Sequence, residues 1–179
     1  MTRRLAKLAL LRFGVVLAAV LQTGAVLSAA PSEYEVKAAF ILNFTRFIQW
    51  PAPAAGAGSP FTICILGEDP FGRIIDDTMA GESVSNRPIV VRRMRQHSPG
   101  GCEVLFVSKG ESDGSRSVVE TGPGVLTIGD SPDFLQKGGV IAFALENRRV
   151  RFDVNQTAAA RASLQISSKL LTVARAVEK

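Results

Sequence analysis

The chain is poor in the residues that most often carry catalytic and metal chemistry. Its 179 residues include one histidine, His97, and two cysteines, Cys64 and Cys102, without a Cys-x-x-Cys pair. Zinc centres and nucleophilic hydrolases need several such groups close together. His97 stands in the run RQHSPGG, which predicts an exposed loop. No Gly-x-Ser-x-Gly elbow is present either, so we expect neither an enzyme nor a metal protein.

A nucleotide fingerprint is also missing. The run GEDPFG at 67–72 follows an apolar stretch and occupies the position of a phosphate loop. It matches neither Gly-x-Gly-x-x-Gly nor the Gly-Lys-Ser/Thr ending, and Glu68 and Asp69 would repel a phosphate. The run is better interpreted as a turn in which Asp69 caps a short helix that starts at Pro70. We therefore expect no cofactor.

The excess of positive charge belongs to the start of the chain. The whole chain has 21 basic and 16 acidic residues, and four of the basic ones (Arg3, Arg4, Lys7 and Arg12) lie in the first thirty positions, which leaves 17 against 16. Two arginine clusters remain, at 92–95 and 148–151, and we interpret them as solvated strand ends. A nucleic-acid partner is not expected, because such proteins keep a basic face.

The first thirty residues have the order of a secretory signal peptide. A basic start precedes an apolar stretch at 13–26, and small residues lead to Ala30, just before Pro31. We expect cleavage after Ala30 and export to the periplasm. The alternative is an uncleaved membrane anchor, but the apolar stretch is shorter than the ~20 residues that a spanning helix needs. The sequence thus predicts a signal peptide at 1–30 and one domain at 31–179.

The domain begins with a well-marked helix. Ser32 and Glu35 make a capping box, and Val36, Phe40, Phe44 and Phe47 recur at helical spacing. Pro51 ends the helix, and the run APAAGAGS at 52–59 is typical of a flexible connector.

Strands and helices alternate through the rest of the domain. The pattern predicts a single α/β domain with a mainly parallel sheet, flanking helices and a C-terminal hairpin that turns at Glu146-Asn147. The expected strands are 61–66, 88–92, 104–107, 125–128, 140–145 and 150–154. The expected helical segments begin near 70, 112, 131, 157 and 167, with Asn155 as a helix cap.

The two cysteines have two possible states. In an oxidising periplasm, a disulfide between Cys64 and Cys102 can form and persist. The alternative is a pair of buried free thiols, because Cys64 lies in an apolar run. Export favours the disulfide.

An ordered set of sequence blocks resembles the YfiR family of periplasmic proteins, including its HmsC-type members. No single block is decisive, but together they span nearly the whole domain. The blocks are EYEVKAAF at 33–40, NF at 43–44, Phe47, WP at 50–51, ICILG at 63–67, DPFG at 69–72, NRPI at 86–89, CEVLFV at 102–107, GGVI at 138–141, VRFDVN at 150–155 and LQISSKLL at 164–171.

This resemblance implies a function that the residues alone do not reveal. Proteins of this family repress inner-membrane diguanylate cyclases by binding their periplasmic sensing domains, which lowers cyclic di-GMP and biofilm formation. An outer-membrane lipoprotein often causes release, and members can form homodimers. The resemblance also implies a Rossmann-like fold without a nucleotide fingerprint, and it supports the Cys64–Cys102 disulfide. Some relatives have a second cysteine pair, which this chain lacks.

Two hypotheses about binding follow. A docking protein should use apolar side chains, and we expect a partner-binding or dimer surface that includes Phe40, Phe44, Phe47, Leu164, Ile166, Leu170 and Leu171. The alternative function is a small-ligand sensor that serves a membrane histidine kinase. Its pocket would lie at the carboxyl ends of the strands, near Gly67, Asp69 and Asp130.

Overall fold

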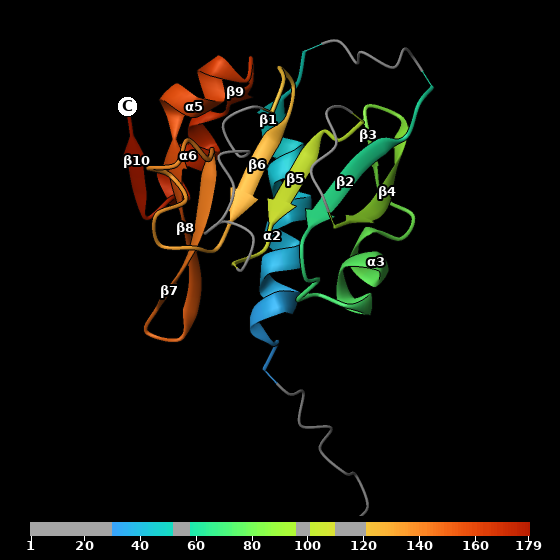
Figure 1. Cartoon of the computed structure of the whole chain (residues 1–179), viewed down its shortest axis with the longest axis horizontal. Coiled ribbons are helices and arrows are strands. Elements are labelled where there is room, and N and C mark those ends of the chain that lie inside the picture. The colour runs from blue at the N-terminus through green and yellow to red at the C-terminus, as the bar shows by residue number, and fades with distance from the viewer. Residues whose placement is uncertain (1–29, 52–57, 96–100, 110–120) are drawn as a thin grey trace, which may run out of the picture. The chain divides into compact units, whose positions relative to one another are not determined.

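A mostly parallel β-sheet organises the chain, as Figure 1 shows. The computed structural model describes residues 30–51, 58–95, 101–109 and 121–179. In this part of the chain the sheet has eight strands in the order β10-β8-β7-β6-β5-β2-β4-β3, and residues Pro31–Lys179 form one unit. The elements are α2 (Glu33–Phe47), β1 (Ile48–Gln49), β2 (Phe61–Leu66), α3 (Arg73–Met79), β3 (Ser83–Val84), β4 (Arg87–Met94), β5 (Val104–Val107), β6 (Leu126–Gly129), β7 (Ile141–Glu146), β8 (Arg149–Asn155), α5 (Gln156–Arg161), β9 (Gln165–Ile166), α6 (Ser168–Val173) and β10 (Ala176–Glu178).

The pairing of the strands confirms the predicted α/β class. Strands β4, β2, β5, β6 and β7 run parallel to one another, whereas the short β3 pairs antiparallel with β4, and β7 and β8 form the predicted antiparallel hairpin. Strand β10 then returns parallel to β8. The described part of the chain contains no helix that is long and apolar enough to cross a membrane.

Helix α2 begins as its sequence predicts. The side chain of Ser32 accepts a hydrogen bond from the amide of Glu35, and the carboxylate of Glu35 accepts one from the amide of Ser32, which completes the capping box. Its buried face differs from the expected one, because Phe40 is half-buried and Phe47 is exposed. The buried residues of the helix are Lys37, Ala38, Ile41, Phe44 and Thr45.

The main core lies between α2 and one face of the sheet. Phe44 is completely buried and packs edge-on against Phe152 of β8, with 4.9 Å between the ring centroids. Phe40 contacts the same ring at 5.4 Å. Aromatic contacts of this kind add to the hydrophobic gain from burying the rings, so they fix α2 across the β7–β8 side of the sheet.

Phe134 fills a second, smaller core on the opposite face. A Cβ atom built on Gly129 would lie 2.4 Å from its ring, and one built on Gly139 would lie 2.2 Å from it. Both glycines therefore allow the ring to approach the backbone closely. Leu105, Val107 and the other members pack beside Phe134.

The hairpin turn sits one residue later than predicted. Asn147 and Arg148 have positive φ values of 51° and 62°, so they form the two-residue loop, and Glu146 pairs with Arg149. Two consecutive residues with positive φ are typical of the hairpin turn that matches strand twist. Beyond residue 142 the hairpin extends past the end of β6 (Figure 1).

Several expected boundaries are wrong or lie outside the described residues. Helix α3 begins after Gly72 rather than at Pro70, because Asp69 accepts hydrogen bonds from the amides of Phe71 and Gly72 in a turn that precedes the helix. Helix α2 ends at Phe47, since the next two residues form β1. The expected loop around His97, the helix at 112–120, and most of the connector fall outside the described residues.

Candidate functional site

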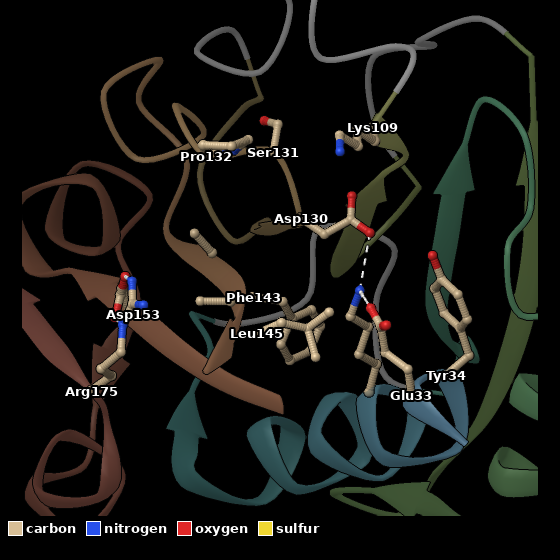
Figure 2. Close-up of a pocket in the computed structure, with 13 residues that line it drawn as sticks. Glu33, Tyr34, Lys109, Asp130, Ser131, Pro132, Phe143, Leu145, Asp153 and Arg175 are labelled. Carbon is tan, nitrogen blue, oxygen red and sulfur yellow. Dashed lines mark hydrogen bonds and ion pairs between the residues drawn. The ribbon is translucent and has the colours of Figure 1, made fainter. Parts of the chain in front are cut away.

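A cavity of about 430 Å³ lies beyond the carboxyl end of β6 (Figure 2). Three parts of the chain form its wall: the first turns of α2, the turn that follows β6, and one side of β7. The lining residues are Glu33, Tyr34, Lys37, Lys109, Asp130, Ser131, Pro132, Ala142, Phe143, Ala144, Leu145, Asp153 and Arg175. The cavity thus occupies the position where parallel α/β sheets commonly bind ligands.

A buried lysine holds the two sides of this cavity together. The Nζ atom of Lys37 lies 2.6 Å from a carboxylate oxygen of Glu33 and 3.1 Å from Oδ2 of Asp130. Figure 2 shows both contacts as dashed lines. Burial alone would lower the pKa of Lys37, but the hydrogen bonds to Glu33 and Asp130 and the charges of both carboxylates outweigh it. The pKa therefore lies above its ordinary value, and the amine stays charged.

A charged lysine cannot act as a nucleophile or a base. Aromatic rings support its charge further, because Nζ of Lys37 lies 4.7 Å from the ring centroid of Tyr34 and 5.7 Å from that of Phe143. Burial raises the pKa of Tyr34, so its phenol stays protonated. Among the described residues that line the cavity, the arrangement serves binding and stability rather than proton transfer.

Two buried oxygen atoms of the cavity make no hydrogen bond of good geometry with any residue that the structure describes. They are Oδ1 of Asp130 and Oγ of Ser131, and the residue Ser131 is only 2% exposed. Leaving such groups unsatisfied is costly. Oδ1 of Asp130 can therefore accept a hydrogen bond from a bound molecule. Ser131 lies near the Asp133 carboxylate and, after Lys137, helps to lower the pKa of that group.

The structure does not bring Asp69 and Gly67 into this cavity. Asp69 instead accepts a hydrogen bond of 2.7 Å from Nε of Arg93, which also binds Asp76 at 2.6 Å. The hydrogen bond from Arg93 lowers the pKa of Asp76. Arg93 is an exposed residue that also anchors the β2–α3 turn. Of the three residues predicted to lie near the pocket, only Asp130 lines the cavity.

The structure joins Cys64 and Cys102 in a disulfide, as expected. Cys64 is fully buried in β2, and Cys102 precedes β5. The guanidinium of Arg92 lies 3.5 Å from Sγ of Cys64 and 3.3 Å from Sγ of Cys102, and it donates to the carbonyl oxygen of Gly101 at 3.1 Å. Arg92 is exposed, as predicted for this cluster, and its guanidinium also covers the disulfide.

The predicted partner-binding residues come from both ends of the domain, and the structure places these ends side by side. Strand β1 pairs with β9, with Ile48 opposite Ile166, and the amide of Ser167 donates to the carbonyl oxygen of Phe47. A shallow hollow of about 480 Å³ lies across this junction. We call the junction, residues 46–49 and 165–169, the β1–β9 surface.

Not all of the predicted residues are accessible at the β1–β9 surface. Phe44, Leu164 and Leu170 are at most 4% exposed and belong to the core. Phe40, Ile166 and Leu171 are half-buried, and Phe47 is 38% exposed. Phe47 is therefore the most accessible apolar side chain among the predicted residues.

Sequence reasoning missed Lys37. Its signal was present, since Lys37 shares a helical face with Ile41 and Phe44 and stands one turn after Glu33. A lysine on an apolar face indicates a buried charge that needs a carboxylate elsewhere in the fold. No group of three or more potential metal ligands occurs within the described residues.

These observations define a disulfide-containing α/β domain with a Rossmann-like sheet and a cavity at the carboxyl end of β6, and its sequence places it in a known family. The chain belongs to the YfiR/HmsC-like family, whose profile matches residues 34–175. Membership supports a role as a periplasmic regulator of diguanylate cyclase signalling, in a family of regulatory, non-catalytic proteins. No curated protein sequence is significantly similar to this chain.

A solved structure supports the fold. The chain resembles a conserved domain protein from Vibrio cholerae O1 biovar El Tor str. N16961 with a TM-score of 0.51 at 9% sequence identity. The alignment covers 82% of this chain but only 60% of the other protein. At this identity the similarity concerns the fold alone.

Proposed function

We propose that this chain is a periplasmic repressor that binds the sensing domain of an inner-membrane diguanylate cyclase and lowers cyclic di-GMP and biofilm formation. The observation that carries the proposal is the β1–β9 surface, which gathers predicted binding residues from both ends of the domain and leaves Phe47 exposed. Membership of the YfiR/HmsC-like family supports the same role.

The mechanism we propose is a shift in population. A repressor that binds the inactive cyclase more tightly than the active one moves the equilibrium toward the inactive state. Changing a largely active population into a largely inactive one takes several kcal/mol of differential affinity. An exposed aromatic side chain at the centre of a docking surface is the kind of residue that supplies it.

Charge reversal at the surface tests the proposal. In a strain that lacks the gene, cyclic di-GMP is expected to rise, and the native chain should restore its low level. Phe47→Glu should fail to restore it, whereas Val90→Glu should succeed. Val90 is a matched control because it is 40% exposed, against 38% for Phe47, but lies on β4. Unchanged cyclic di-GMP in the deletion strain would refute the repressor function.

Export is part of the proposal and has its own test. The mature protein should begin at Pro31, after removal of residues 1–30, and should appear in the periplasmic fraction. Mass spectrometry of the purified protein measures the cleavage site directly. A protein that keeps its first thirty residues and stays in the cytosol would contradict the proposal.

The β1–β9 surface could also join two copies, and light scattering of the Phe47→Glu variant would show whether a homodimer depends on it.

A second candidate function is a small-ligand sensor that serves a membrane histidine kinase. The cavity at Asp130, with its two buried oxygen atoms, favours it. A specific ligand raises the melting temperature of the protein it binds. Thermal-shift screening of the mature protein against small metabolites would therefore identify such a ligand, and Ser131→Ala should weaken the shift.

A further inference from the structure

Strand β7 has an edge that no other strand covers within the described residues. It pairs with β6 only at Ile141 and Ala142, but it continues to Glu146. Glu146 and Arg149 flank the two-residue turn and therefore exchange main-chain hydrogen bonds. By the alternation of an antiparallel pair, the N–H and C=O groups of the even-numbered residues of β7 point toward β8. The N–H and C=O groups of Phe143 and Leu145 therefore point toward the side that β6 leaves empty.

Two hollows meet along this edge. The cavity of about 430 Å³ described above lies on the side of Asp130 and Ser131. A groove of about 490 Å³ lies nearer the hairpin tip, between the apolar side chains of Val36 and Phe40 and the hairpin. Leu145 and Glu33 line both hollows, and Leu145 is 56% exposed. An extended chain that follows the β7 edge would pass from one hollow into the other.

The chemistry along this path changes from one end to the other. At the β6 end, two buried oxygen atoms line the path: Oγ of Ser131, and Oδ1 of Asp130, which makes no hydrogen bond to a described residue. At the tip, Arg148, Arg149 and Arg151 are exposed and form no ion pair with any described residue. The first two also line the apolar groove. A matching segment would have hydrogen-bond donors where it passes Asp130 and Ser131. Near the hairpin tip it would have an apolar residue flanked by carboxylates.

We propose that an extended, acidic segment of the membrane partner adds to the sheet as a strand beside β7. This inference rests on the proposed function and names the mode of recognition. Strand addition uses the main-chain groups of Phe143 and Leu145, which pair with no described residue on this side of β7, and the hollows beside the strand select the side chains. Uncovered strand edges are usually short or protected in natural proteins, and the segment protects this one. The edge and the β1–β9 surface lie at opposite ends of α2 (Figure 1).

Two pairs of variants test the main-chain and the charge contacts separately. Leu145→Pro removes one N–H group from the free edge, whereas Leu145→Thr keeps it and changes the side chain in the same position. Proline is tolerated at an edge position that makes no bond within the sheet. Arg148→Asp/Arg149→Glu reverses the charge of the tip, and Arg161→Glu is the control on α5. Asp suits position 148 because φ is positive there.

The probe is the periplasmic domain of the cyclase that the chain represses. Leu145→Pro should bind this domain about tenfold more weakly than Leu145→Thr, which is the typical effect of one lost hydrogen bond. The double arginine variant should also bind more weakly than Arg161→Glu, and added salt should reduce the difference. Melting temperatures identify any variant that fails to fold. Equal affinities within both pairs of folded variants would overturn the inference.

Photo-crosslinking in whole cells gives a readout that does not depend on the cyclase. A photoreactive amino acid at position 145 should form an adduct with an acidic, extended segment of a membrane protein, and one at position 173 should not. Val173 is a suitable control because it is 57% exposed on α6. No adduct at 145, or an adduct only with residues of this chain or of a second copy, would overturn the inference. A different outcome is an adduct with such a segment of a membrane protein that is not a cyclase, in cells whose cyclic di-GMP level does not change when the gene is deleted. That result would support strand addition and refute the proposed function.

Discussion

Removing the Cys64–Cys102 disulfide should cost the domain a large share of its stability. The bond joins residues that are 38 positions apart. In the chain-entropy model, a loop of this length restricts the unfolded chain by about 4 kcal/mol at 25 °C. A typical domain is stable by only 5–15 kcal/mol. The oxidised protein should therefore need clearly more urea to unfold than the reduced one.

The assay compares three forms of the mature protein by urea denaturation. They are the oxidised protein, the protein reduced with dithiothreitol, and the Cys64→Ala/Cys102→Ala variant. Reduction should lower the free energy of unfolding by about 4 kcal/mol. The double variant should lose at least as much, because Cys64 is fully buried and alanine leaves a small void in its place. A loss below about 1 kcal/mol in both forms would refute the entropic reasoning.

Three other perturbations probe the two cores and the disulfide. Lys37→Met should destabilise the domain by about 3–5 kcal/mol in urea denaturation, because it leaves the Asp130 carboxylate without its counter-charge. The folded protein raises the pKa of Lys37, so the charged amine stabilises the fold fully below its ordinary pKa of 10.5, and this stabilisation is lost as the pH rises through the folded pKa. Between pH 9 and 12, the free energy of unfolding should therefore fall more steeply for the native chain than for Lys37→Met. Gly139→Ala should lower the melting temperature, because the added carbon would lie 2.2 Å from the ring of Phe134 and overpacking costs about 1–3 kcal/mol; an unchanged melting temperature would contradict this. Arg92→Gln should make the disulfide harder to reduce, because the guanidinium favours the thiolates that reduction creates, and glutathione titration would measure the difference.

Local signals in the sequence predicted most of the sheet correctly. The capping box at Ser32 and Glu35, the apolar runs that form β2, β5 and β6, and the helix cap at Asn155 all depend on neighbours close in sequence. The parallel arrangement followed from the alternation of strands and helices. Each of these features leaves a signal within a short stretch of the sequence, even where its final contacts are with other strands.

Elements that depend on distant partners were missed. Strands β1 and β9 have two residues each and exist because they pair with each other. All three residues of β10 are exposed and show no apolar alternation, so only the pairing with β8 defines this strand. The helical pattern of Phe40, Phe44 and Phe47 was recognised, but the face that packs against the sheet is set by tertiary contacts.

The candidate site could be predicted only in part. Asp130 follows a strand, and that position alone indicated a pocket. Its partner Lys37 comes from the other end of the domain, and the pairing needs the complete fold. The uncovered edge of β7 is also invisible in the sequence, because it arises where β6 ends before its neighbour does.

The contact between the first helix and the last segments constrains the order in which the domain can fold. Phe44 packs on Phe152, and Ile48 pairs with Ile166. A polypeptide that crosses a membrane from its N-terminus would have α2 on the far side long before these partners arrive. If the chain is exported as proposed, this core cannot close on the far side of the membrane until translocation is nearly complete.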